Sequence, residues 1–320
     1  MAGAGGGSAG NGDAGSMSSA AGTAGGSISA AGAAGAAGSG GAASAPTTRC
    51  QTLSFSTPPQ VESDERVCAD FAFNHTYNEG PTWVQSQNAF FFTNFVIFDG
   101  TAGDIIKYVP GAGCEIFIED VGCNGLAVSN DGNLLAACHK SRSIIQFDIE
   151  TKEPTTLASS YMGDMLDTPN DVVMHSNGTI YFTNPNYELD GRPPGVGQAV
   201  FRIDPSRTLH LVDQPSRCNG IGLTPDETKL YVLQAGMWDL DAQGLPGDRR
   251  DLFVSGDGMA VDCAGNLYAS DGIFSATGER LAEFDSGTNL AFGGADGRTL
   301  LVVGRNSVVR ELRMSIPGLP

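Results

Sequence analysis

One pattern of hydrophobic and polar residues recurs along most of the chain. Each copy begins with a polar residue, continues as a short run of alternating apolar residues, turns, and enters a second run of β-forming residues. The copies begin at intervals of 45, 46, 49, 38 and 32 residues, at Glu79, Asn124, Asn170, Asn219, Asp257 and Asn289. Intervals of this size are typical of the blades of a propeller.

The sequence inside each copy predicts strands joined by tight turns. Around the seventh residue after each start lies a turn sequence such as NDG, SNG or ADG. Asn, Asp and Gly tolerate the positive φ angles that hairpin turns require. Runs such as AFFFTNF, TIYFTN and TLLVV predict second strands, and SIIQFDIE, AVFRIDP and VVRELRM predict third ones. We therefore predict an all-β, six-bladed β-propeller. Residues 50–78, with the strand-like RVCADFAF, should supply the outer strand of the last blade and close the ring.

The first part of the chain has a different composition. Of residues 1–46, 39 are Gly, Ala or Ser, which predicts a disordered tether in front of a propeller domain spanning 47–320. Neither a basic nor an apolar leader segment follows Met1 in this sequence. Because such tethers often follow export signals, we expect one upstream. This favours an extracytoplasmic protein (secreted, periplasmic or surface-tethered), with a cytoplasmic location as the alternative.

The net charge of the chain excludes some classes of binding partner. Asp and Glu number 36 against 18 Lys and Arg, a net charge of −18. Nucleic acid and anionic membranes require a basic surface, so we expect neither as a partner. No apolar window predicts a membrane span, and a monomer is expected.

The cysteines allow two interpretations. Cys50 with Cys68, and Cys114 with Cys123, are close enough in sequence to form disulfides in an exported protein, although buried free cysteines are equally compatible.

A propeller brings equivalent positions of its repeats together around one axis. The six starting residues should therefore meet at one mouth of the central channel, and all six carry a side-chain oxygen. Two are carboxylates, which repel each other when buried unless a cation compensates them. An all-oxygen set favours one divalent cation, Ca²⁺ foremost, with Mg²⁺, Mn²⁺ or Zn²⁺ as alternatives. For any single Asn, capping of a turn is the simpler explanation.

The motifs that carry these residues resemble a known family. EGPTW, PNDVV, CNGIGLTPDETKLYV, DGMAVDCAGNLY and TNLAFGGADGRTLLVV are similar to the senescence marker protein/gluconolactonase/luciferin-regenerating enzyme family over about residues 60–318. The resemblance implies a six-bladed propeller that holds one divalent cation and hydrolyses lactones. It implies that Glu79, Asn170, Asn219 and Asp257 bind the cation, that Asp257 is also the catalytic base, and that Asn170 could instead hold substrate.

Further residues are candidates for contact with a small-molecule lactone substrate. Asn124 and Asn289 share the phase of the ligand set, and Tyr187 and Trp238 follow strand ends. His139 ends the hairpin of the second unit, although an isolated histidine more often lies in the core or on the surface. The function we expect is opening of a sugar lactone, with the carbonyl polarised by metal and the attacking water activated by Asp257. The alternatives are a non-catalytic binding module and a metal-dependent esterase of broader specificity.

Overall fold

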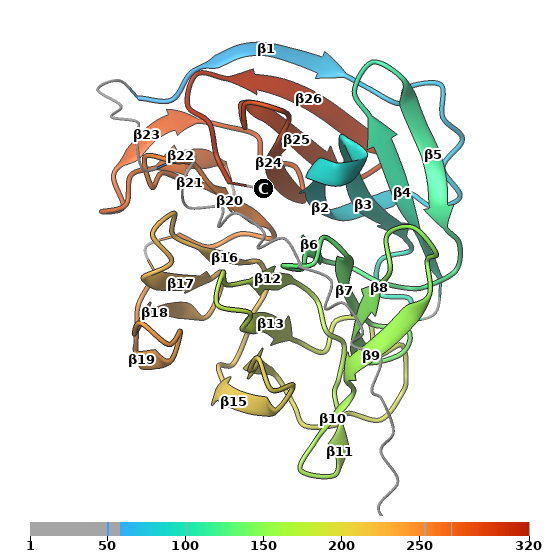
Figure 1. Ribbon diagram of the computed structural model, residues 1–320, viewed down its shortest axis with the longest axis vertical. Helices are drawn as coiled ribbons and strands as arrows, with labels where there is room; N and C mark the ends of the chain where they lie inside the picture. Colours follow the sequence, from blue (N-terminus) through green and yellow to red (C-terminus); the bar gives the residue numbers. More distant parts are fainter. Residues whose placement is uncertain (1–49, 51–57, 101, 253, 270, 320) are drawn as a thin grey trace, which may run out of the picture. The chain divides into compact units, whose positions relative to one another are not determined.

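The computed structural model describes Cys50 and residues 58–100, 102–252, 254–269 and 271–319. The predicted tether, 1–46, lies outside the described residues. The described residues form six four-stranded antiparallel sheets, and Figure 1 shows these sheets arranged as the blades of a propeller. The predicted six-bladed all-β fold is confirmed. Among the described residues, no helix is long and apolar enough to span a membrane.

Each blade runs from an inner strand to an outer strand. The first blade consists of β2 (Tyr77–Val84), β3 (Ala89–Phe95), β4 (Gly103–Val109) and β5 (Gly113–Ile118). The second consists of β6 (Leu126–Val128), β7 (Leu134–Cys138), β8 (Ser143–Phe147) and β9 (Pro154–Ala158). The third consists of β12 (Val172–Met174), β13 (Ile180–Asn184), β14 (Ala199–Ile203) and β15 (Leu209–Asp213).

The remaining blades repeat this order. The fourth consists of β16 (Ile221–Leu223), β17 (Lys229–Val232), β18 (Gly236–Leu240) and β19 (Pro246–Arg250). The fifth consists of β20 (Met259–Val261), β21 (Leu267–Ala269), β22 (Gly272–Phe274) and β23 (Arg280–Glu283). The sixth consists of β24 (Asn289–Gly293), β25 (Thr299–Gly304), β26 (Val308–Met314) and β1 (Val61–Arg66). The 3₁₀ turn Gln85–Gln87 connects β2 with β3, and a small hairpin, β10 (Ser160–Tyr161) with β11 (Asp164–Met165), follows the second blade.

The hydrophobic core lies between neighbouring blades. Phe91 of the first blade, for example, packs in one buried cluster with Leu134 and Ala136 of the second. Side chains alternate between the two faces of a strand, so a blade covered on both faces is apolar on both. This explains why AFFFTNF is buried throughout as β3.

The first strand closes the ring. β1 pairs with β26 in antiparallel register, so residues 50–78 do supply the outer strand of the last blade. The strand is VESDER, however, and the expectation that RVCADFAF forms it is wrong. Cys68 in that segment has a positive φ of 54°, and Phe71 and Phe73 pack on the core of the first blade. This segment is therefore a partly buried connection between the last blade and the first.

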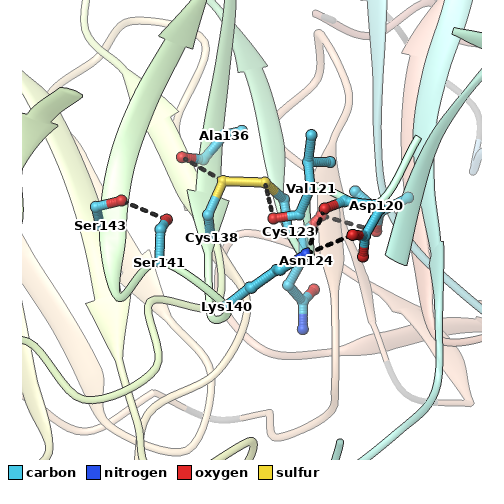
Figure 2. Close-up of a disulfide and its surroundings, with 10 residues drawn as sticks. Asp120, Val121, Cys123, Asn124, Ala136, Cys138, Lys140, Ser141 and Ser143 are labelled. Carbon is cyan, nitrogen blue, oxygen red and sulfur yellow. Dashed lines mark hydrogen bonds and ion pairs between the residues drawn. A yellow bond between two sulfur atoms is a disulfide. The ribbon is translucent and has the colours of Figure 1, made fainter. Parts of the chain in front are cut away.

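Three disulfides link residues that the blades bring together. They are Cys50–Cys263, Cys68–Cys114 and Cys123–Cys138, and Cys218 is free and buried. The pairs expected from closeness in sequence are therefore wrong, because strand register and blade packing determine which cysteines are neighbours. Figure 2 shows that the third disulfide lies directly beside Asn124, the first residue of the second repeat.

Glycine allows the inner strands to approach one another at their starts. Gly80, Gly125, Gly220 and Gly258 each follow a repeat-starting residue. The N–H of Gly125 donates to Asn170 O (2.6 Å), and that of Gly220 donates to Asp257 O (2.8 Å), so backbone hydrogen bonds join one blade to the next. A Cβ at Gly220 would lie 2.5 Å from Asp257 O, well inside van der Waals contact.

We expect Gly220→Ala to lower the free energy of unfolding by about 2 kcal/mol, because its methyl group would push two inner strands apart. Denaturant unfolding measures this change. The matched control is Gly247→Ala on the exposed strand β19, where the nearest atom to a new Cβ is Asp239 O at 3.6 Å. Equal stability of the two variants would contradict tight packing at the mouth.

Candidate active site at the channel mouth

Five of the six repeat-starting residues line one cavity. Its volume is about 190 Å³, and its walls include Glu79, Asn124, Asn170, Asn219 and Asp257. Each of these residues lies at or just before the start of the inner strand of its blade, where neighbouring inner strands come close together. The phase of the repeat therefore becomes a ring of oxygen-bearing side chains.

Two side chains hold the carboxylate of Asp257. Tyr77 Oη donates to Oδ2 (2.9 Å), and Asn219 Nδ2 donates to Oδ1 (2.7 Å). Burial raises the pKa of Asp257, while these two hydrogen bonds and the nearby Arg305 favour its ionised form. Because its Nδ2 is used in this way, Asn219 presents Oδ1 as its remaining acceptor.

Glu79 is the most deeply buried acid of the predicted ligand set. Its side chain is only 3% exposed, and its Oε2 accepts the N–H of Gly80 (3.2 Å). Burial, followed by the neighbouring Asp257 and Asp171, holds the pKa of Glu79 well above its usual range. Among the described residues, no Lys, Arg or His forms an ion pair with Glu79 or Asp257.

The sixth repeat-starting residue lies deeper in the channel. Asn289 lines a second cavity of about 180 Å³, together with Asp171. Its Oδ1 accepts the N–H of Leu290 (2.8 Å). Asn289 therefore lies in a different cavity from the other five repeat-starting residues, and its contact with substrate stays a prediction.

Asp171 is a third acid of the channel that sequence analysis missed. Its carboxylate accepts the N–H groups of Val172 (3.0 Å) and Ile221 (3.2 Å), and burial raises its pKa to about 7. The sequence did contain a sign of it. Four repeats carry Gly directly after the starting residue, whereas the third reads Asn170–Asp171.

His139 and Trp238 lie outside the mouth. His139 is fully buried, its ring centroid is 5.1 Å from that of Phe95, and burial lowers its pKa to about 4. Trp238 is 2% exposed and belongs to an apolar cluster that includes Tyr181 and Leu230. His139 directly follows β7, whereas Trp238 lies within β18 and not after a strand end as expected, and both side chains lie in the core.

The long connection from β13 to β14 brings Tyr187 and Glu188 to the mouth. Both line the cavity, and Tyr187 Oη donates to Cys218 O (3.0 Å). Glu188 is 3% exposed, and its Oε2 has no hydrogen-bond partner in the described part of the chain. Burial, together with Asp257, raises the pKa of Glu188 to about 7.

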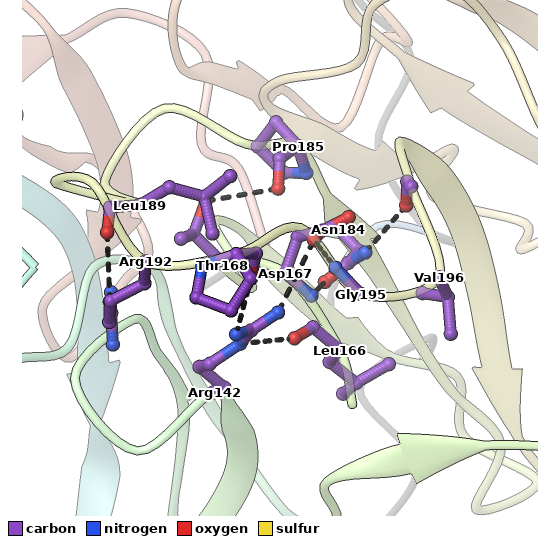
Figure 3. A network of polar contacts seen from close by, with 12 residues as sticks. Arg142, Leu166, Asp167, Thr168, Asn184, Pro185, Leu189, Arg192, Gly195 and Val196 are labelled. Carbon is purple, nitrogen blue, oxygen red and sulfur yellow. Dashed lines mark hydrogen bonds and ion pairs between the residues drawn. The ribbon is translucent and has the colours of Figure 1, made fainter. Parts of the chain in front are cut away.

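Two arginines fix this connection, as Figure 3 shows in part. Arg142 ion-pairs with buried Asp167 (3.3 Å), which also accepts the N–H of Gly195. Arg192 donates to four backbone carbonyls, those of His139 (3.1 Å), Lys140 (3.0 Å), Glu188 (2.6 Å) and Leu189 (3.0 Å). The connection is therefore bound to the second blade, which holds Glu188 beside the cavity.

The donor set of the mouth fits a hard divalent cation. Nowhere in the described ranges do three His, Cys or acidic side chains form a metal-ligating cluster. The predicted set instead combines two carboxylates with two amide oxygens, from Glu79, Asp257, Asn170 and Asn219. Oxygen-only ligands suit Ca²⁺ or Mg²⁺, and buried acids without ion-pair partners are groups that a cation would stabilise.

Comparisons with known proteins identify a family that covers most of this chain. Residues 77–305 match the family described as SMP-30/Gluconolactonase/LRE-like region. The chain belongs to this family. Its curated relatives include a gluconolactonase from Zymomonas mobilis, 31% identical over 307 residues that cover 81% of this chain and 82% of the relative.

Solved structures share the fold of the family. A gluconolactonase from Xanthomonas campestris is 23% identical with a TM-score of 0.67, covering 82% of this chain and 97% of its own. Regucalcin from Agrobacterium tumefaciens, described as a calcium-binding protein, is 19% identical with a TM-score of 0.63, covering 83% and 97%. At these identities the likeness extends to the propeller fold.

The buried acid Glu188 predicts a dependence of stability on pH. Its pKa is raised from 4.5 to about 7, so the folded protein keeps this proton over a range in which the unfolded chain has released it. The free energy of unfolding should therefore fall as pH rises from 5 to 8, with Glu188 contributing up to about 3 kcal/mol of that fall.

We expect Glu188→Gln to reduce this loss of stability. Denaturant unfolding at both pH values, with chelator present, measures it. Glu119→Gln, at an exposed position, is the matched control. If the wild-type protein and Glu188→Gln lost equal stability over this pH range, the proposed burial of the Glu188 carboxyl would be wrong.

Proposed function

We propose that this protein is a metal-dependent lactone hydrolase that opens the ring of a sugar lactone. The observation that carries the proposal is Asp257, a half-buried carboxylate held by Tyr77 and Asn219 at the mouth of the channel. Membership of the SMP-30/gluconolactonase family and the gluconolactonase relative from Zymomonas mobilis support the choice of substrate.

Glu79, Asn170, Asn219 and Asp257 would hold the cation, most simply Ca²⁺. When bound, such an ion supplies Lewis-acid stabilisation of the carbonyl oxygen that becomes negative during attack. The calcium-binding description of the regucalcin neighbour supports this choice of ion. The uncompensated burial of Glu79 supports it independently, since this carboxylate has no ion-pair partner among the described cations.

Asp257 would act as the general base. It removes a proton from water, the water oxygen bonds to the carbonyl carbon, and the ring C–O bond breaks. The released ring oxygen takes up a proton, and the product is a hydroxy acid. Asp257 suits this task better than Glu79, because it is half-buried at the mouth and its hydrogen bonds favour the ionised form.

Polar residues around Asp257 would bind the hydroxyl groups of the sugar. Asn124, Asn170 and Tyr187 line the same cavity, and the free Oε2 of Glu188 adds an acceptor that sequence analysis missed. A site of this kind discriminates substrates that satisfy its buried polar groups from those that leave them unpaired.

We expect the protein to hydrolyse glucono-δ-lactone, with activity lost in chelator and restored by Ca²⁺. Asp257→Asn should lower kcat/KM by at least about 100-fold, because the amide cannot accept the proton. The matched control is Asp248→Asn on exposed strand β19. Full activity in chelator would contradict the metal role. Stabilisation by Ca²⁺ without any turnover would favour a binding module, and faster cleavage of aryl esters would favour an esterase.

We also propose an extracytoplasmic location, because three disulfides are typical of oxidising compartments. Protein isolated from its native cells should, when denatured without reductant, expose one alkylatable thiol, that of Cys218, among its seven cysteines. Mass spectrometry after alkylation counts the modified thiols. Alkylation of all seven without reduction would contradict this location.

A further inference from the structure

Two arginines lie at the mouth beside the acids. Arg217 lies two residues before Asn219, the start of the fourth repeat, and Arg305 directly follows β25 of the sixth blade. Both are exposed, and both line the cavity that contains Asp257. Two separate blades therefore direct a guanidinium to the same opening.

Neither arginine forms an ion pair with an acid among the described residues. In a chain with 36 acids and 18 basic residues, other arginines do pair, such as Arg249 with Asp213 (3.0 Å) and Arg310 with Asp285 (3.0 Å). Within the described part of the chain, no carboxylate lies in ion-pair distance of Arg217 or Arg305. Their donors remain available to a ligand.

An aromatic ring lies against the guanidinium group of Arg305 at the cavity. Arg305 Cζ lies 5.6 Å from the centroid of the Tyr77 ring, and Tyr77 Oη in turn donates to Asp257 (2.9 Å). Arg217 and Tyr187 line the same cavity. Stacking such as that of Arg305 reduces the freedom that a long side chain loses when it binds a ligand.

A neutral sugar lactone does not account for these groups. Its hydroxyls are served by the Asn, Tyr and Glu side chains of the same cavity. Electrostatic support of Asp257 accounts in part for Arg305 but leaves Arg217 without a role. A guanidinium presents a planar fork of donors that matches carboxylate or phosphate oxygens.

We infer that the substrate is a lactone that carries an anionic group, a carboxylate or a phosphate ester, bound by Arg217 and Arg305. This inference rests on the proposed lactone hydrolysis and names the class of its substrate. The anion would lie at the rim on the arginines, while the lactone ring reaches Asp257 at the floor. The two arginines would also offset the repulsion between an anionic substrate and the acidic mouth.

The test compares matched lactones on the full chain in the presence of Ca²⁺: glucono-δ-lactone, its 6-phosphate, and the monolactone of glucaric acid. We expect kcat/KM for at least one anionic lactone to exceed that of the neutral one about tenfold. The phosphate and carboxylate arms distinguish the two sources of charge. Arg217→Gln and Arg305→Gln should each lower the anionic-to-neutral ratio about tenfold, mainly through KM, and added salt should lower it as well.

Arg207→Gln is the matched control. It removes one positive charge from an exposed position in the turn between β14 and β15, at the end of the blade away from the mouth. It should leave the ratio unchanged. A ratio of one or less for the wild-type protein, or equal losses on both kinds of lactone in the two mouth variants, would overturn the inference while lactone hydrolysis stands.

Titration calorimetry separates this inference from the proposed function. 6-Phosphogluconate should bind more tightly than gluconate, since it carries the additional anion, and both mouth variants should lose the difference. If no lactone is hydrolysed, the proposed hydrolase function fails, whereas the anion site is judged by this binding difference alone. Equal binding of the two compounds overturns the anion site.

Discussion

The close approach of the inner strands at one end of the channel is the constraint on which the site depends. Backbone hydrogen bonds such as Gly220 N–H to Asp257 O join neighbouring blades, and glycine leaves no side chain between them. Because the backbones meet so closely, the residues that precede these glycines have only the channel to point into. The close packing of the inner strands thereby brings together oxygen-bearing side chains that lie far apart in sequence.

The same packing creates an electrostatic conflict. The carboxyl groups of Glu79, Asp171 and Asp257 lie close enough for their charges to repel one another. Burial also opposes the charged form of each. A fold without a ligand to bind would gain stability by replacing such acids with apolar residues. Their presence is understandable if stability is exchanged for binding of the proposed cation.

The sequence predicted those features that repeat in phase. Blade number, strand order and the ring of Glu79, Asn124, Asn170, Asn219 and Asp257 followed from one spacing. Features set by a single loop were missed, because no periodicity marks them. Glu188 reaches the mouth only because Arg192 and Asp167 fold its connection back, and Cys50 meets Cys263 only because the ring closes. Asn289 has the same phase but lines a different cavity, which the spacing alone does not predict.

Ring closure also determines how the protein can be attached to something else. Cys50 is bonded to Cys263, in the turn between β20 and β21, and Gly318 near the other end of the chain bridges to Asp262 beside it. This turn lies at the end of the fifth blade away from Asp257. Both ends of the described chain therefore meet on the face opposite the mouth. A support or fusion partner joined directly after Gly318 would therefore lie away from the mouth that contains Asp257.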